Sequence, residues 1–332
     1  VVAFAIGVSA LFYACSYLDR DRPNLRFVST IAGIDNSIGE PFGIAAKDGM
    51  TYISDGEKGE IWKIEADGRS SVIAKGLDTP SAVAIDKNGD LLVADSGTHT
   101  IKKIDKSGNI SLVAGVEARS GNNNGDTSAA LFNAPIGIVA ADNKIYVADT
   151  YNDRIRLIEN GQVRTIAGST TGFSDGTEAR FNTPTGLALW HDKLLVADTG
   201  NNRIRVVEPD GSVWTLAGNG VSDRVNGSLL SASFVHPTGI AVDPDGTIYV
   251  TDGNAVRRIG GVVPIVTTLN NGDRGTRDGS LAVSRFNRPS GIAVDDKGDL
   301  IIADSENRLV RRISADKGSH EITSVEIAAR RD

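Results

Sequence analysis

The chain of 332 residues is acidic, with a formal net charge of −7, and it contains a single cysteine, Cys15. An acidic chain lacks the basic surface on which phosphate-driven binding depends, so we expect no nucleic-acid partner. One cysteine can form neither an internal disulfide nor a thiolate metal cluster.

An apolar segment begins the chain. Residues 1–18 contain no charged side chain, and as an α-helix they would extend about 27 Å, close to the thickness of a bilayer's hydrocarbon core. We interpret them as a retained membrane anchor, with a cleaved secretory signal and a lipoprotein signal lipidated at Cys15 as alternatives. Residues 19–25 form a polar, proline-containing linker. The domain that follows is expected outside the cytoplasm, in a periplasmic or extracellular location.

Residues 26–332 contain six copies of one repeat. The clearest copy, residues 184–218, has four short apolar runs separated by polar or glycine-rich connections, which predicts four antiparallel strands. Successive copies are 39 to 55 residues apart, and a period of this length built from strands predicts an all-β fold, a six-bladed β-propeller of four-stranded blades. Each copy starts at a proline, and these anchor prolines are Pro41, Pro80, Pro135, Pro184, Pro237 and Pro289.

Two segments compete for the outer strand of the last blade. Residues 26–33 match the last strand of a repeat but precede the first anchor proline, and residues 321–327 also have a strand pattern. A closed propeller has no free sheet edge, and strands from both chain ends commonly complete one blade. We expect residues 27–32 in the closing blade with the C-terminal run beside them, although the sequence leaves this choice open.

Longer connections precede the third to sixth repeats. Each contains an Asp-Gly or Asn-Gly pair, which indicates a turn, and a phenylalanine three residues before the proline, which we interpret as a plug between blades. In an up-and-down blade these insertions lie on the same face as the turns between the second and third strands. One face is therefore thickened over four blade junctions, and we expect it to bind partners. The four phenylalanines are Phe132, Phe181, Phe234 and Phe286.

An aspartate ends the second strand of every repeat. A catalytic site is used once, whereas a turn is needed six times, so we interpret these residues as structural caps that accept backbone N–H bonds in the following turn. They are Asp55, Asp95, Asp149, Asp198, Asp252 and Asp304. Arginines in or just after these turns are expected to pair in part with the acids, and they are Arg154, Arg156, Arg203, Arg205, Arg257, Arg258, Arg311 and Arg312.

The segments PTGLAL, LLVADTGNNRIRVVEPDG and PTGIAVDPDGTIYVTD resemble the NHL-repeat family, over roughly residues 26–327. The resemblance implies a propeller. It does not imply one activity, because propellers include binding proteins, lyases, lactonases and receptor sensor domains. The fifth and sixth repeats depart from the turn motif, with DGNAVRR and DSENRLVRR.

Histidines are the residues through which lyases resembling this family hold zinc or carry out catalysis. The four in this chain occupy unrelated repeat positions, so we do not expect them to converge on one metal. Acidic residues in the turns that join first and second strands are interpreted as hairpin formers and not as calcium ligands. We predict no catalytic residue, no metal site and no cofactor. The histidines are His99, His191, His236 and His320.

The function predicted from these features is a membrane-tethered scaffold or accessory subunit that binds protein partners, themselves membrane-associated, through the insertion-bearing face. A metal-dependent enzyme of lyase or lactonase type and a sensor of a small ligand are the alternatives. The candidate binding residues lie in the turns of the third and fourth repeats, and they are Tyr151, Asn152, Arg154, Asn201, Asn202 and Arg203.

Overall fold

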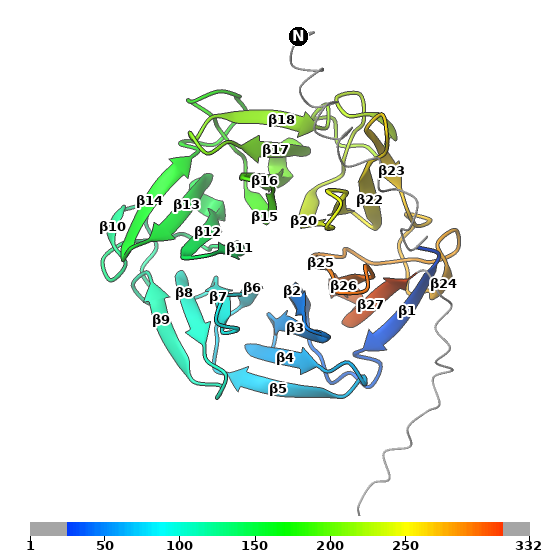
Figure 1. Cartoon of the computed structure of the whole chain (residues 1–332), viewed down its shortest axis with the longest axis horizontal. Helices are drawn as coiled ribbons and strands as arrows, with labels where there is room; N and C mark the ends of the chain where they lie inside the picture. Colours follow the sequence, from blue (N-terminus) through cyan, green and yellow to red (C-terminus); the bar gives the residue numbers. More distant parts are fainter. Residues whose placement is uncertain (1–24, 315–332) are drawn as a thin grey trace, which may run out of the picture.

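Six antiparallel sheets surround a central axis in the computed structural model, which describes residues 25–314 (Figure 1). The predicted six-bladed propeller is confirmed. The proposed anchor in residues 1–18, Cys15, His320 and the candidate strand 321–327 all lie outside the described residues. Within residues 25–314 there is no helix with the length and apolar character needed to span a bilayer.

The blades follow chain order, and in each the first strand lies nearest the axis (Figure 1). A short 3-10 helix follows the second strand in three blades: η1 (Thr150–Asn152), η2 (Thr199–Asn201) and η3 (Ser305–Asn307). The principal strands are β2 (Pro41–Lys47), β3 (Met50–Asp55), β4 (Glu60–Ile64) and β5 (Ser70–Lys75) in blade 1; β6 (Pro80–Ile85), β7 (Leu91–Asp95), β8 (Thr100–Ile104) and β9 (Ile110–Ala114) in blade 2; β11 (Gly137–Ala141), β12 (Lys144–Asp149), β13 (Arg154–Glu159) and β14 (Gln162–Ala167) in blade 3; β15 (Pro184–Trp190), β16 (Lys193–Asp198), β17 (Arg203–Val207) and β18 (Val213–Ala217) in blade 4; β20 (Pro237–Val242), β21 (Ile248–Asp252), β22 (Ala255–Gly260) and β23 (Ile265–Thr268) in blade 5; and β25 (Ile292–Val294), β26 (Leu300–Asp304) and β27 (Leu309–Ser314) in blade 6.

Blade 6 is completed by the beginning of the described chain. Strand β1 (Phe27–Ala32) pairs antiparallel with β27, with Phe27 opposite Ser314 and Val28 opposite Ile313. The expectation that residues 27–32 close the ring is confirmed. Because this blade joins segments almost 300 residues apart in sequence, its hydrogen bonds lock the propeller into a closed ring.

Three blades contain a fifth strand that the four-stranded prediction missed. The insertions form β10 (Gly125–Asp126), β19 (Gly227–Ser228) and β24 (Gly279–Ser280), which pair with the outer strands β14, β23 and β1. In blade 4 the corresponding Gly176 forms an isolated bridge to Val213. The Asn-Gly and Asp-Gly pairs therefore lead the insertions along the outer edges of the blades, where they cover exposed backbone groups.

Around the axis, glycines allow the inner strands to approach one another closely. A Cβ atom on Gly137, Gly186 or Gly239 would overlap a backbone carbonyl oxygen on, or just before, the inner strand of the next blade. Side-chain hydroxyls also link adjacent blades: Thr199 donates to the Pro237 carbonyl at 2.7 Å, and Ser290 donates to the Phe42 carbonyl at 2.8 Å. The inner ring is thus held by close backbone contact and by hydrogen bonds between blades.

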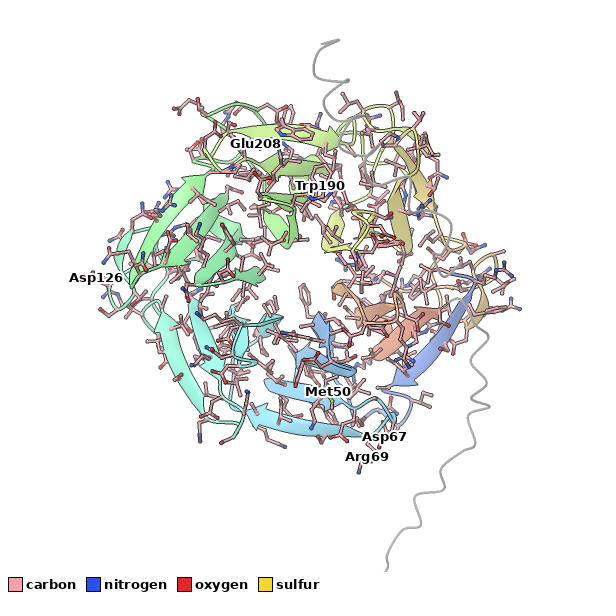
Figure 2. All side chains as sticks on the ribbon, in the orientation of Figure 1. Met50, Asp67, Arg69, Asp126, Trp190 and Glu208 are labelled. Atoms are coloured by element: carbon pink, nitrogen blue, oxygen red, sulfur yellow. The ribbon has the colours of Figure 1, made fainter. Side chains whose placement is uncertain are left out.

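The hydrophobic core lies in the seams between blades, which side chains fill (Figure 2). Phe132 is fully buried and packs with Leu92 and Ala94 of blade 2 and with Ile138 and Val147 of blade 3. Phe181, Phe234 and Phe286 are equally buried in the next three seams. The interpretation of the insertion phenylalanines as plugs between blades is confirmed.

Candidate functional site

A buried arginine occupies the same position on the third strand of blades 3 to 6. Each guanidinium forms an ion pair with the aspartate that ends the second strand, at 2.6 to 2.7 Å between nitrogen and oxygen, and both side chains are fully buried. The predicted pairing is confirmed for these four of the eight arginines. The pairs are Arg156 with Asp149, Arg205 with Asp198, Arg257 with Asp252, and Arg311 with Asp304.

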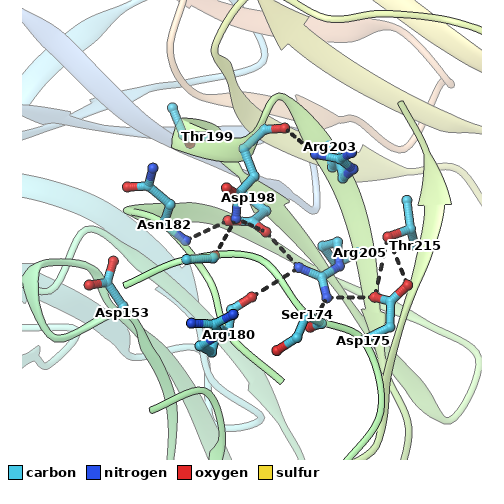
Figure 3. A network of polar contacts seen from close by, with 12 residues as sticks. Asp153, Ser174, Asp175, Arg180, Asn182, Asp198, Thr199, Arg203, Arg205 and Thr215 are labelled. Atoms are coloured by element: carbon cyan, nitrogen blue, oxygen red, sulfur yellow. Dashed lines mark hydrogen bonds and ion pairs between the residues drawn. The ribbon is translucent and has the colours of Figure 1, made fainter. Parts of the chain in front are cut away.

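The two Nη nitrogens of each guanidinium also bind the insertion, as Arg205 illustrates (Figure 3). Its Nη1 donates to the Arg180 carbonyl at 3.2 Å, and its Nη2 donates to the Ser174 carbonyl at 2.7 Å and to Asp175 Oδ1 at 2.6 Å. Asp175 belongs to the Asp-Gly pair, and Arg180 directly precedes Phe181. One planar guanidinium therefore holds the insertion at two points, and the other three arginines make equivalent contacts. We call this arrangement the arginine clamp.

The clamp arginine also lies over the insertion phenylalanine. The guanidinium carbon of Arg205 is 5.2 Å from the ring centre of Phe181, and the distances in the three other blades are 4.9 to 5.1 Å. A cation over an aromatic face in a dry seam is stabilised by the ring quadrupole. Charge and apolar packing thus act together to hold the insertion on the blade.

The strand-ending aspartates connect three segments. Asp198 Oδ1 accepts the backbone N–H of Asn182 in the insertion, and Oδ2 accepts from Arg205 (Figure 3). Asp198 Oδ2 also accepts from the side-chain amide of Asn201 in the turn. The sequence analysis expected these aspartates to accept backbone N–H groups of the turn. Asp55 does so, because it accepts the Lys58 N–H at 3.0 Å. Burial raises the pKa of Asp198, and the hydrogen bonds and the Arg205 charge oppose that effect.

A second contact joins successive blades on this face. In four turns a side chain accepts the backbone N–H of the residue that precedes the next anchor proline, and three of the accepting residues have a positive φ. Asn202 Oδ1, for example, accepts from His236 at 3.0 Å. The other acceptors are His99 Nδ1 from Ala134, Asp153 Oδ1 from Thr183 and Asn254 Oδ1 from Arg288. We call this contact the turn staple.

The six predicted binding residues lie in two neighbouring turns, and most of their polar atoms serve internal contacts. Asn152 and Asn201 donate to the insertion carbonyls of Gly121 and Gly172, both at 2.7 Å, and Asn202 forms a turn staple. Arg154 Nε donates to the Ser169 carbonyl at 3.2 Å. Tyr151 is 63% exposed at the tip of η1. The structure thus divides the set into structural amides and exposed side chains, and a binding role stays a prediction.

Arg203 connects two insertions at the surface. Its guanidinium carbon is 3.9 Å from the ring centre of Phe173 in the insertion before blade 4, and its Nη2 donates to the Asn219 carbonyl in the insertion before blade 5 at 2.9 Å. Arg203 thereby makes these two neighbouring insertions one continuous surface.

Apolar side chains exposed in the insertions were missed by the sequence reasoning. Val221 and Leu230, in the insertion before blade 5, are 60% and 62% exposed. The available signal was the presence of large aliphatic residues within polar insertion tips. The exposed large apolar residues of the insertions, the turns on this face and the connection after β1 are Ile34, Tyr151, Phe173, Val221, Val225, Leu230 and Val283.

The axial cavity has a volume of about 90 Å³ and is lined by the inner strands. Its polar side chains are hydroxyls, from Ser81, Thr185, Thr238 and Ser290, and these also participate in the hydrogen bonds of the inner ring. Among residues 25–314, no cluster of three or more histidine, cysteine, aspartate or glutamate side chains has a geometry suited to a metal ion.

The radial sheets and their repeated Asp-Arg-Phe contacts define a six-bladed β-propeller. The NHL repeat model matches residues 77–104, 181–207, 234–259 and 286–313, which correspond to blades 2, 4, 5 and 6. The chain therefore contains NHL repeats within a six-bladed β-propeller, as the resemblance in the strand and turn motifs implied.

Four curated proteins are similar in sequence, including the following two. Protein SUPPRESSOR OF QUENCHING 1, chloroplastic, from Arabidopsis thaliana is 27% identical over 80% of this chain and 33% of its own length. NHL repeat-containing protein 2 from Gallus gallus is 44% identical over 27% of this chain and 12% of its own length. The chain thus spans a third or less of the curated relatives that it matches.

Solved structures share the fold at low sequence identity. A protein of unknown function from Bacteroides thetaiotaomicron aligns with a TM-score of 0.71, 18% identity and coverage of 87% of this chain and 76% of that one. A gluconolactonase from Xanthomonas campestris aligns with a TM-score of 0.62 and 15% identity, over 87% of this chain and 89% of that one. Virginiamycin B lyase from Staphylococcus aureus aligns with a TM-score of 0.58 and 16% identity, over 86% of this chain and 98% of that one. At such identities the similarity concerns the fold alone.

Proposed function

We propose that this propeller is a protein-binding scaffold or accessory subunit, held at a membrane outside the cytoplasm by residues 1–18, and that its partner docks on the insertion-bearing face. The observation that carries the proposal is the group of exposed apolar side chains on insertions that the arginine clamps hold in place. Exposed apolar residues surrounded by polar groups are characteristic of protein-interaction surfaces.

The insertions are already held in place before a partner binds, which lowers the entropy cost of binding and so supports this proposal. A flexible loop loses conformational freedom when a partner binds, and that loss weakens the complex. Here each of the four insertions is already bound by a guanidinium, a phenylalanine plug and an aspartate carboxylate. The apolar tips are therefore presented on a rigid base, and docking requires little further ordering.

Site-specific photo-crosslinking in native membranes tests the docking face. A photoreactive amino acid replaces Leu230 on the face, and in a matched variant it replaces Leu112, which is 51% exposed on β9 at the outer edge of blade 2. We expect a discrete cross-linked protein from position 230 and none from position 112. The same adduct from both positions, or none from position 230, would contradict the proposal.

Membrane tethering and location are tested separately. With residues 1–18 present, the protein should stay in the membrane pellet after alkaline carbonate washing, and protease added outside intact cells or spheroplasts should reach the propeller. A variant lacking residues 1–18 should be released by the wash. Release of the full chain, or protection of its propeller from protease, would contradict this part of the proposal.

A further inference from the structure

A cavity of about 480 Å³ opens where blades 5, 6 and 1 meet on the insertion-bearing face. It lies beside the inner ring, since Thr238 and Ser290 contribute to its base. Its size is within the range of cavities that bind small molecules or single side chains. The charged and apolar side chains of its walls are Glu40, Phe42, Val235, His236, Arg288 and Glu306.

The cavity occurs at a junction where the turn staple changes. In blade 6 the turn residue with positive φ is Arg308, whose side chain has no hydrogen-bond acceptor. Arg308 instead pairs with Glu57 of blade 1 at 3.2 Å. The N–H of Glu40, which precedes the anchor proline of blade 1, donates to Asp55 within its own blade. The turn staple found at the four junctions from blade 2 to blade 6 is therefore missing at this junction.

Charges in and around the cavity leave one carboxylate unmatched. Arg288 pairs with Glu306 at 3.4 Å, and Arg308 pairs with Glu57. Within the part of the chain that the structure describes, the Glu40 carboxylate has neither a hydrogen bond nor an ion pair. Partial burial raises the pKa of Glu40, repulsion from Glu306 and then from Glu57 adds to the effect, and the charges of Arg288 and Arg308 oppose it without cancelling it. A cation placed beside Glu40 would relieve this repulsion.

We propose that this cavity binds the ammonium or guanidinium group of a lysine or arginine side chain that the protein partner inserts. Glu40 binds the cation through a charge-assisted hydrogen bond, and the aliphatic stem packs on Phe42 and Val235. The inference rests on the proposed function, because it assigns to the docking face a pocket for one basic anchor residue. A buried anchor in a pocket surrounded by weaker contacts is the usual organisation of a tight protein interface.

Binding of small analogues by the full chain tests the cavity without the partner. The two probes are Nα-acetyl-arginine amide and its neutral counterpart Nα-acetyl-citrulline amide, with dissociation constants measured by NMR titration. We expect the arginine analogue to bind in the millimolar range, about fivefold or more tighter than the citrulline analogue, since a partly exposed ion pair contributes about 1 kcal/mol. E40Q should reduce its affinity to the citrulline level.

The matched control is E178Q, which removes an exposed carboxylate from the insertion before blade 4 on the same face. This variant should bind the arginine analogue as the unmodified chain does. Equal affinity for the two analogues, or an equal loss of affinity in E40Q and E178Q, would overturn the inference. Preferential binding of N-acetyl-glutamate amide would also overturn it, because the cavity would then select anions through Arg288.

The two proposals can fail independently. If position 230 cross-links to a partner but the arginine analogue does not bind, the docking face stands and the basic anchor is wrong. If the analogue binds as expected but no cross-link forms, the cavity selects cations and the proposed function is wrong.

Discussion

Blades 3 to 6 differ from blades 1 and 2 at one position of the third strand. The residue opposite the middle of the second strand is the clamp arginine in the four later blades, as in the Val196–Arg205 pair. In blade 2 it is Lys102, which pairs with Asp95 at 2.8 Å and with Glu117 at 3.0 Å. In blade 1 it is Trp62, opposite Ile53. The four blades with the arginine are the four that are preceded by long insertions.

This difference shows what a buried charge does in the propeller. A guanidinium has five donors in a rigid fork, so it can bind an aspartate and two separated points of an insertion at once. The connection into blade 1 is short, and there Asp55 accepts the backbone N–H groups of Gly39, Glu40 and Lys58 directly, at 2.7 to 3.1 Å. The long insertions depend on the clamp for their order, whereas the short connections do not.

Loss of a clamp arginine should have the largest effect. Arg205→Met leaves Asp198 as a buried, unpaired charge and removes three bonds to the insertion, so we expect a destabilisation of about 3–5 kcal/mol. Urea denaturation measures the loss, and limited proteolysis should show cleavage within residues 168–183. Lys102→Met is the matched variant in blade 2. If Lys102→Met increased proteolysis of the insertions as much as Arg205→Met does, the proposed difference between the arginine blades and blade 2 would be wrong.

Closure of the inner ring provides the next test. Gly186→Ala adds a methyl group that overlaps the Thr238 carbonyl, and we expect a cost of about 1–3 kcal/mol in thermal denaturation. Blade 2 already has an alanine, Ala82, at the corresponding position, opposite Ala94 on β7. The reverse change there, Ala82→Gly, should cost less than about 1 kcal/mol. Equal costs at the two positions would show that the spacing between blades is uniform.

A turn amide should have a smaller effect. Asn201→Ala removes the bonds to the Gly172 carbonyl and to Asp198, so we expect a loss of about 1 kcal/mol and faster hydrogen exchange in the insertion before blade 4. Asn109→Ala removes an exposed bond to Asp105 in blade 2 and should stay within about 0.5 kcal/mol. If exchange in the insertion were unchanged, the turn would not contribute to its order.

The smallest effect concerns Glu40 and pH. Its pKa is raised in the folded protein, so the folded state binds more protons than the unfolded state at the upper side of glutamate titration. Stability should therefore fall as the pH rises through that range, and Glu40→Gln should remove this component. Urea denaturation between pH 4 and pH 8 compares the two proteins. The facing groups Glu57, Glu306, Arg288, Arg308 and His236 remain in both, and parallel pH profiles would contradict the prediction.

The candidate site could be predicted only in part. Phe181 and the Asp-Gly pair were recognisable because they recur before several anchor prolines. The position of the insertions on one face of the propeller was predictable because successive connections of an up-and-down blade alternate between its two faces. The ion pair of Arg205 with an aspartate was predicted, but its partners in the insertion were not, because its donors reach carbonyls 25 and 31 residues earlier in the chain. Every residue has a backbone carbonyl, so the sequence does not show which carbonyls accept a hydrogen bond.

The sequence by itself determined the number of blades, the four principal strands of each blade and the buried phenylalanines. These features depend on local alternation and on repetition, which can be read along the chain. Only the tertiary structure decided which of Tyr151, Asn152 and Asn201 stay free at the surface, and that Glu40 faces an open cavity. Those properties arise from contacts between blades, where residues far apart in sequence either find a partner or do not.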